Sequence, residues 1–267
     1  MKQQPITRPS IKRGLLAASL ALGFGLSAGP AMAAEGLNQH ADEILQSMSK
    51  FLAGTKAFSV TADISNEFIT TEAQKLQLNS HATVLVERPS RFYVTRKGKF
   101  ADAELIFDGS TVTLYGKTAN GYVQKDVAGT IDQAISTIET DSVLNLPVAD
   151  LLLSNPYKAL SSGVTSSGYY GTAYVGGVQC HHLAFRTPKV DWQIWVKDGA
   201  DPLPMKYVIT TKWLAGAPQY SVELSNWNTK PAITADKFKF VVPKGAKKLQ
   251  ALAVDEMGEL ALPEEGK

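Results

Sequence analysis

Hydrophobic and polar positions follow two different periods along the chain. Between residues 37 and 52 apolar side chains recur every three or four positions, with polar residues between them, and Gly54 ends the pattern. This spacing predicts an amphipathic helix. From Ala57 the period becomes two, which is typical of β-strands. The alternation predicts strands at 57–69, 75–87, 91–97, 103–108, 110–115, 121–126, 169–175, 178–186, 190–198, 204–213, 218–227 and 237–242.

Short turn sequences separate most of these segments. Asp108-Gly109, Asn120-Gly121, Gly176-Gly177 and Asp198-Gly199 all suit tight hairpins, because their residues tolerate positive φ angles. Successive hairpins predict an antiparallel sheet. A flat sheet of about 11–12 strands is unstable, so we expect this one to curl or close.

A helical pattern interrupts the two runs of strands. Thr130 and Gln133 match a capping box ahead of apolar positions at helical spacing. Asn155-Pro156 predicts a helix that begins with an asparagine cap and a proline in its first turn. Between them, residues 143–153 (VLNLPVADLLL) are strongly apolar, contain a proline and are too irregular for a single helix.

Several strands carry large apolar residues on both faces. Phe92 and Val94 oppose Tyr93, while Trp192 and Ile194 oppose Trp195. A sheet with one face in water alternates more cleanly. The pattern fits a curled sheet whose inner face meets helices or a ligand, and it fits ordinary packing under loops equally well.

The first 33 residues have the features of a secretory signal peptide. Four basic residues and no acidic one precede an apolar run at 14–26, and Ala31-Met32-Ala33 is a small-residue cleavage pattern. We therefore expect cleavage after Ala33 and residence in the periplasm. The run is shorter than a bilayer span, and no other span is predicted. We expect one domain at 34–243 and a flexible tail at 244–267, where the periodicity is lost.

Charge and cysteine content narrow the classes of function. The leader carries four positive charges, so its removal changes the formal net charge from +2 to −2 and leaves no basic patch for nucleic acid. Cys180 is the single cysteine, which rules out an intrachain disulfide.

Cys180, His181 and His182 are the main candidates for chemistry. Neighbouring residues of a strand point to opposite faces, so the two histidines cannot share a metal ion, and a zinc site needs three or four ligands. Cys180 and His182 share a face, yet no cationic group in the sequence marks an activated thiol. We find no serine elbow and no phosphate-binding glycine loop. The sequence therefore predicts no enzyme, no cofactor and no metal.

The best candidates for a binding site are apolar. The apolar segment at 143–153 and the inner-facing residues of the strands predict a hydrophobic cavity and its lid. Its candidate residues are Leu144, Leu146, Val148, Leu151, Leu152, Leu153, Phe92, Val94, Trp192 and Ile194. For the tryptophans taken singly, core packing explains their positions as well.

Three stretches carry a resemblance to a known family. They are 104–115 (ELIFDGSTVTLY), 147–160 (PVADLLLSNPYKAL) and 175–211, which includes GGVQCHHLAF and VDWQIWVKDGADPLPMKYVITT. Over about residues 41–248 the chain resembles a family of predicted periplasmic proteins of unknown function, placed near the lipoprotein-carrier (LolA/LolB-like) superfamily. Arg88-Pro89, Phe92 and Asp108-Gly109 are the trace of that more remote relationship.

The resemblance implies a fold and a class of ligand. The fold is mainly β, an incomplete antiparallel β-barrel with an N-terminal helix and a helical lid or plug, residues 131–161, on its concave face. Such a cavity holds acyl chains in the carriers, but no functional residue of theirs matches a position here. The leading hypothesis is a non-enzymatic carrier for acyl chains, lipoprotein lipid or another hydrophobic ligand. The alternatives are an envelope protein–protein interaction or sensing module without a cavity, and a hydrolase with an unrecognised site.

Overall fold

The computed structural model describes residues 36–99, 102–127, 129–141 and 146–250. The chain divides after Ala33, and the fold described below belongs to the unit Ala34–Lys267. The predicted signal peptide and its cleavage site lie outside the described residues.

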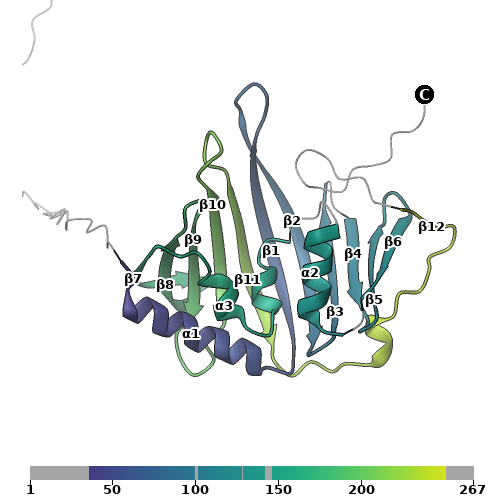
Figure 1. The fold of residues 1–267 in the computed structure, drawn as a ribbon, viewed down its shortest axis with the longest axis horizontal. Coiled ribbons are helices and arrows are strands. Elements are labelled where there is room, and N and C mark those ends of the chain that lie inside the picture. Colours follow the sequence, from purple (N-terminus) through teal and green to yellow (C-terminus); the bar gives the residue numbers. More distant parts are fainter. Residues whose placement is uncertain (1–35, 100–101, 128, 142–145, 251–267) are drawn as a thin grey trace, which may run out of the picture. The chain divides into compact units, whose positions relative to one another are not determined.

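Twelve strands of the described chain form one sheet (Figure 1). They are β1 (Ala57–Ile69), β2 (Lys75–Glu87), β3 (Arg91–Gly98), β4 (Asp102–Phe107), β5 (Thr111–Gly116), β6 (Gly121–Asp126), β7 (Ser166–Val175), β8 (Val178–Arg186), β9 (Val190–Lys197), β10 (Pro204–Thr211), β11 (Gln219–Asn228) and β12 (Lys247–Lys248). The helices are α1 (Gln39–Gly54), α2 (Ile131–Asp141) and α3 (Pro156–Leu160), with two 3-10 turns, η1 (Ala149–Leu152) and η2 (Ala235–Phe238).

The sheet is built from two runs of hairpins that meet in its middle. Its order is β12-β6-β5-β4-β3-β2-β1-β11-β10-β9-β8-β7. Strands β1 to β6 and β7 to β11 each pair with their chain neighbours, and β11 returns to pair with β1. All these pairs are antiparallel, whereas β12 joins β6 in parallel. Strands β7 and β12 are the two edges, so the sheet is not closed, as predicted.

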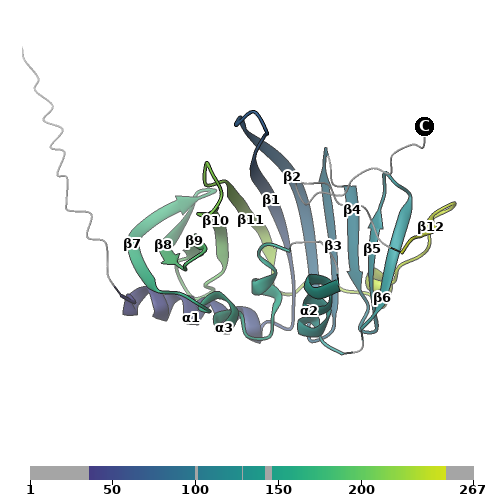
Figure 2. The ribbon, with the colours of Figure 1, turned by 45° about the horizontal axis from the view of Figure 1, so that its top comes forward.

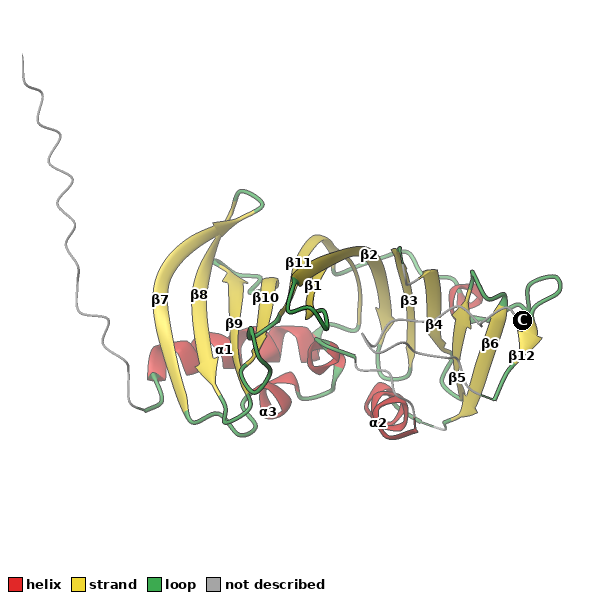
Figure 3. Cartoon of the chain, turned by 90° about the horizontal axis from the view of Figure 1, so that it is seen from above, coloured by secondary structure: helices red, strands yellow, loops and turns green. Residues whose placement is uncertain are grey.

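The sheet curves around its helices. Along its width the strands change direction progressively (Figure 2), and seen from above α1, α2 and α3 all lie inside the curve (Figure 3). This confirms the predicted curled, mainly β fold with a helix at its start. The main hydrophobic core lies between the inner face of the sheet and these helices.

Helix α1 forms where the 3.6-residue period predicts it. The Asn38 side chain caps it by accepting a hydrogen bond from the Ala41 amide at 2.8 Å. Its apolar stripe, which includes Leu45, Met48 and Leu52, is buried, and the helix contacts α3 and η1 as well as β7, β8 and β9. Burial of one face explains why the helix lies flat across that part of the sheet.

The caps predicted for the central helices are present. Gln133 Oε1 accepts from the Thr130 amide at 2.9 Å, and the Gln133 amide donates to Thr130 Oγ1 at 3.4 Å. In α3, Asn155 Oδ1 accepts from the Lys158 amide at 3.0 Å. Each cap satisfies backbone donors that the first helical turn leaves without partners.

The strand predicted at 237–242 is wrong. Residues Ala235–Phe238 form the turn η2, and the following residues are irregular. Strand β11 already has β10 and β1 on its two sides, so no free edge remains for a further antiparallel neighbour. The apolar residues alternate here because two phenylalanines pack against the sheet. Phe238 is buried beneath Arg91, and Phe240 packs on Tyr115 and Tyr122.

The tail predicted from residue 244 is also corrected at its start. Lys247–Lys248 add a short parallel strand to β6, and the Leu249 amide donates to the Tyr122 carbonyl at 2.8 Å. Two residues are too few to show a period in the sequence. Residues 251–267 lie outside the described part of the chain.

Candidate functional site

A cavity of about 990 Å³ lies between the middle of the sheet and the segment that follows α2. This volume is near the top of the range for ligand pockets, about 300–1,000 Å³. Its wall is mainly the inner faces of β1, β2, β3, β10 and β11. Strand alternation creates this wall, because every second residue of β1 from Phe58 to Ile64 points inward and is buried.

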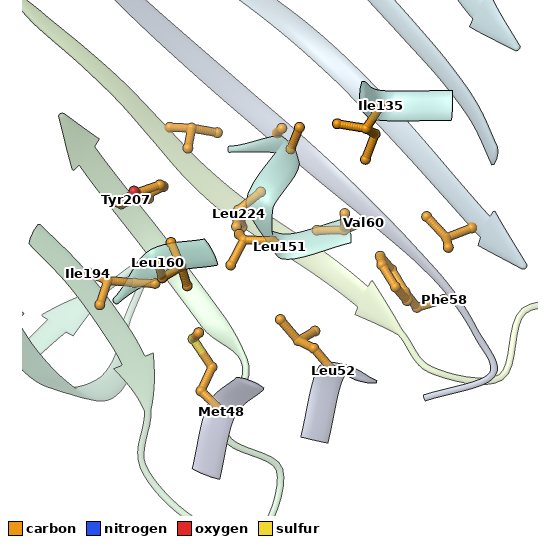
Figure 4. Packing of buried hydrophobic residues seen from close by; sticks show 14 of the residues in the cluster. Met48, Leu52, Phe58, Val60, Ile135, Leu151, Leu160, Ile194, Tyr207 and Leu224 are labelled. Carbon is orange, nitrogen blue, oxygen red and sulfur yellow. The ribbon is translucent and has the colours of Figure 1, made fainter. Parts of the chain in front are cut away.

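Residues 146–152, in the middle of the lid or plug expected at 131–161, cover the cavity. From here on, the plug means residues 146–152 alone. All seven of its residues line the space, and Leu151 is its most deeply buried leucine. Figure 4 shows Leu151 in the same cluster as Val60 and Leu224 of the sheet and Leu160 of α3. Val148 adopts a φ of +74°, a value that a β-branched residue rarely takes, and this turn leads directly into η1.

Polar contacts hold the plug and its flanks in place. Arg88 Nη1 donates to the Leu152 carbonyl at 2.5 Å, and Nη2 donates to the Leu151 carbonyl at 3.5 Å. Burial lowers the pKa of Arg88, against a smaller opposing effect of Asp132. Asp132 of α2 accepts from the amide and hydroxyl of Ser154, at 2.8 Å and 2.6 Å. The plug is therefore fastened by hydrogen bonds at its end as well as by leucine packing.

The outer part of the cavity is bordered by two hairpin tips. Phe68 and Ile69 of β1 and Leu214 after β10 line this part. The tips touch, since a Cβ placed on Gly216 would lie 2.9 Å from Ile69 Cδ1. Both hairpins extend past their neighbours (Figure 1), and Trp213 beside them is 68% exposed.

Two of the polar residues that line the cavity lie among buried apolar neighbours. Asp150 is in the plug, and burial raises the pKa of its carboxyl. Tyr207 is on the inner face of β10, and burial together with the charge of Asp150 raises the pKa of its hydroxyl. Glu67 differs from both, because Lys75 pairs with it at 3.1 Å.

Most of the predicted cavity residues line this space. Seven of the ten do so: Leu146, Val148, Leu151, Leu152, Phe92, Val94 and Trp192. Ile194 is fully buried in the core, and Leu153 packs against the core, and neither lines the cavity. Leu144 lies outside the described residues.

Sequence reasoning missed the contribution of β1, β11 and β10. Ile64, Val222 and Tyr207 line the cavity although none was a candidate. Alternation marked their strands correctly, but it does not indicate which inner-facing residues meet a helix and which meet a space. Asp150 was missed because an aspartate in an apolar segment suggests a helix cap or a solvent position.

The cysteine and the two histidines have ordinary structural partners. Cys180 is completely buried, which raises the pKa of its thiol and disfavours a reactive thiolate. His182 stacks on Trp195 and bonds with Gln193 at 2.9 Å. His181 lies on the other face and bonds with Tyr169 and Asp198. Among the described residues no group of three or more possible metal ligands occurs.

The fold and cavity define a class of protein: an open, curved antiparallel sheet whose concave face is covered by helices over an apolar space. The chain belongs to the family described as "Predicted periplasmic protein (DUF2092)", whose model matches residues 41–252. No curated protein matches the sequence.

Solved structures with a similar fold have little sequence identity to this chain. An uncharacterised conserved protein from Thermus thermophilus is 14% identical, with a TM-score of 0.47, over 79% of this chain and 99% of that one. The lipoprotein LppX of Mycobacterium tuberculosis is 11% identical, with a TM-score of 0.42, over 73% and 98%. A LolA superfamily protein from Nitrosomonas europaea is 8% identical, with a TM-score of 0.38, over 75% and 97%.

Within the ranges that the structure describes, no helix is both long and apolar enough to cross a membrane.

Proposed function

We propose that this protein is a non-enzymatic periplasmic carrier that binds an acyl chain, of a lipid or a lipoprotein, in the cavity beneath the plug. The observation that supports this function is the volume of the space, about 990 Å³, with a wall that is mainly aliphatic and aromatic. Burial of each methylene group contributes ~0.8 kcal/mol, so an acyl chain needs no covalent step to be held.

Movement of the plug controls access to the cavity in this proposal. The only regular structure in the plug is the four-residue turn η1, and Arg88 holds the end of the plug by hydrogen bonds. Short segments with few backbone bonds open at a lower free energy than the strands around them. Opening of such a lid sets the rates at which ligand is bound and released.

The proposal includes export through the leader at 1–33. We expect signal peptidase to cut after Ala33, so that the exported protein begins at Ala34. Intact-mass measurement of the protein from a periplasmic fraction tests this step. A mass that retains the leader would contradict it.

The binding function is tested with diphenylhexatriene, a hydrocarbon that fluoresces in apolar surroundings. We expect the protein to bind it and native mass spectrometry to detect co-purified lipid. Ala62→Phe fills the cavity from the inner face of β1 and should abolish the fluorescence gain. Thr61→Phe is the matched control, since its side chain points to the opposite face and does not line the cavity. If neither probe nor lipid binds, the envelope interaction or sensing module is favoured instead.

A further inference from the structure

Tyr207 carries a hydroxyl in the cavity wall that has no hydrogen-bond partner among the described residues. The residue is only 4% exposed, and it lies on the inner face of β10 between Ile194 and Val222 of the neighbouring strands. The ring of Trp192 stands edge-on to it, with 5.5 Å between centroids. The hydroxyl oxygen is not among the fully enclosed side-chain atoms that lack a partner, so it opens onto the cavity, where a ligand group can reach it.

Asp150 presents a second polar group to the same space, from the opposite wall. It belongs to η1, between the buried residues Ala149 and Leu151, and it lines the cavity. No described residue donates a hydrogen bond to its carboxylate. Asp150 and Tyr207 therefore line one cavity from the plug and from the sheet, and the charge of Asp150 adds to the effect of burial in raising the pKa of the Tyr207 hydroxyl.

No basic side chain of the described chain donates a hydrogen bond to either group, and the guanidinium of Arg88 near Asp150 is bound to the carbonyls of Leu151 and Leu152. Arg96 is the one basic residue among the described residues of the cavity wall, and its Nε donates to Ser80 at 3.0 Å. Arg96 is on β3 and Tyr207 on β10, four strand spacings apart, which is roughly 19 Å along the sheet. Tyr207 therefore lies on the β10 side of the wall and the arginine on its β3 side.

The chemistry of the two groups selects a particular ligand group. An ionised carboxylate only accepts hydrogen bonds, whereas a phenol both donates and accepts. A ligand hydroxyl donates to Asp150 and accepts from Tyr207, and an amide does the same through its N–H and its C=O. A ligand carboxylate is repelled by Asp150 in a poorly solvated site.

We propose that Asp150 and Tyr207 form a polar subsite inside the cavity that binds a neutral hydrogen-bond donor, a hydroxyl or amide group, carried by the apolar ligand. The subsite rests on the proposed function, since it requires a ligand in the cavity. It narrows the ligand class to hydroxylated or amide-linked acyl compounds and disfavours free fatty acid anions.

Displacement of diphenylhexatriene by ligands of equal chain length tests the subsite. At pH 8 we expect 1-tetradecanol and N-methyltetradecanamide to displace the probe at concentrations about tenfold lower than tetradecanoate does. Tyr207→Phe should weaken both neutral ligands about 3- to 10-fold, the effect of one lost hydrogen bond. Asp150→Asn keeps the shape, removes the charge, and should largely abolish the discrimination against tetradecanoate.

Two control variants separate the subsite from general effects. Tyr93→Phe removes a hydroxyl from the other face of β3, and Asp201→Asn removes an exposed carboxylate, so both should behave as the unchanged protein does. The probe could bind while Tyr207→Phe and Asp150→Asn leave the relative affinities of the three ligands the same as in the unchanged protein. In that case the subsite is wrong and the cavity function stands. If the probe does not bind the unchanged protein, the proposed function fails and the subsite with it.

Discussion

The inner face of the sheet is filled on one side and hollow in its middle. Over β8 and β9 the cover is helix α1, and Leu45 and Met48 of the helix and Leu183 and Ile194 of the strands are all completely buried. Over β1, β10 and β11 the cover is the plug, whose only regular structure is the four-residue turn η1. A cavity of about 990 Å³ remains beneath it.

The difference follows from the length and regularity of the two covers. A 16-residue amphipathic helix presents one continuous apolar stripe, so its side chains interdigitate with the strands. A short turn cannot span the same area. The inner faces of β8 and β9, covered by α1, thus form core, whereas the inner faces of β1, β10 and β11, covered by the plug, form the wall of the cavity.

The strongest test of this comparison replaces two isoleucines on adjacent strands. Ile194→Ala in β9 opens a void in the filled region and should lower the free energy of unfolding by about 2–5 kcal/mol. Ile209→Ala in β10 enlarges an existing space and should cost only about 1–2 kcal/mol. Urea denaturation measures both. Equal losses would mean that the cavity is filled in solution, and diphenylhexatriene binding should change in Ile209→Ala alone.

Arg88→Ala tests whether the plug depends on its hydrogen bonds. The variant loses the donors to the Leu151 and Leu152 carbonyls, and we expect a stability loss of about 1–3 kcal/mol. Diphenylhexatriene should dissociate about tenfold faster, because 1.4 kcal/mol in the opening equilibrium is a factor of ten. Stopped-flow dissociation provides the measurement. Arg91→Ala, which leaves the plug untouched, is the control, and unchanged dissociation in Arg88→Ala would contradict the role of the contact.

Smaller effects are expected when the N-terminal caps of α1 and α3 are removed. Asn38→Ala removes the cap of α1 and should lower stability by about 1 kcal/mol without changing the affinity for diphenylhexatriene. Asn155→Ala removes the cap of α3, whose residues Ala159 and Leu160 line the cavity, and should change that affinity. Thermal unfolding and probe titration of both variants check the pair. The reverse assignment of effects would show that α1, and not the segment around the plug, controls binding.

Local sequence signals predicted most of the fold. Thr130 with Gln133 and Asn155 with Lys158 form their caps because these bonds involve residues three apart, which the sequence displays directly. Gly109 and Gly176 adopt positive φ at predicted turns. The turn before β6 is shifted: it spans 117–120, and Gly121 is already the first strand residue.

The failures concern pairing between distant segments. Residues 237–242 alternate like a strand, yet whether a strand forms depends on a free sheet edge, and β11 has none. The edge at β6 is free, so Lys247–Lys248 pair there although their sequence carries no strand signal. Local patterns cannot reveal which edges other segments have already occupied.

The sequence allowed us to predict which residues face inward, but not which of these residues line a cavity. Phe92 and Trp192 were expected to face inward, and they line the cavity, whereas Ile194 is completely buried in the core and does not line it. The distinction depends on which cover lies above each residue. Asp150 and Tyr207 line the same cavity only because the plug folds over the sheet, so no spacing in the sequence links them.

The smallest predicted effect concerns the carboxyl group of Asp150. Its pKa is raised in the folded protein, so the folded state binds a proton more readily than the unfolded state, and ionisation opposes folding. Asp150→Asn should therefore be slightly more stable than the unchanged protein at pH 7. As the pH falls through the raised pKa and then below about 3.9, the unfolded value, this advantage should disappear. Urea denaturation from pH 7 to pH 3 measures it, and a variant that is less stable at pH 7 would mean that the carboxylate has a partner within the protein.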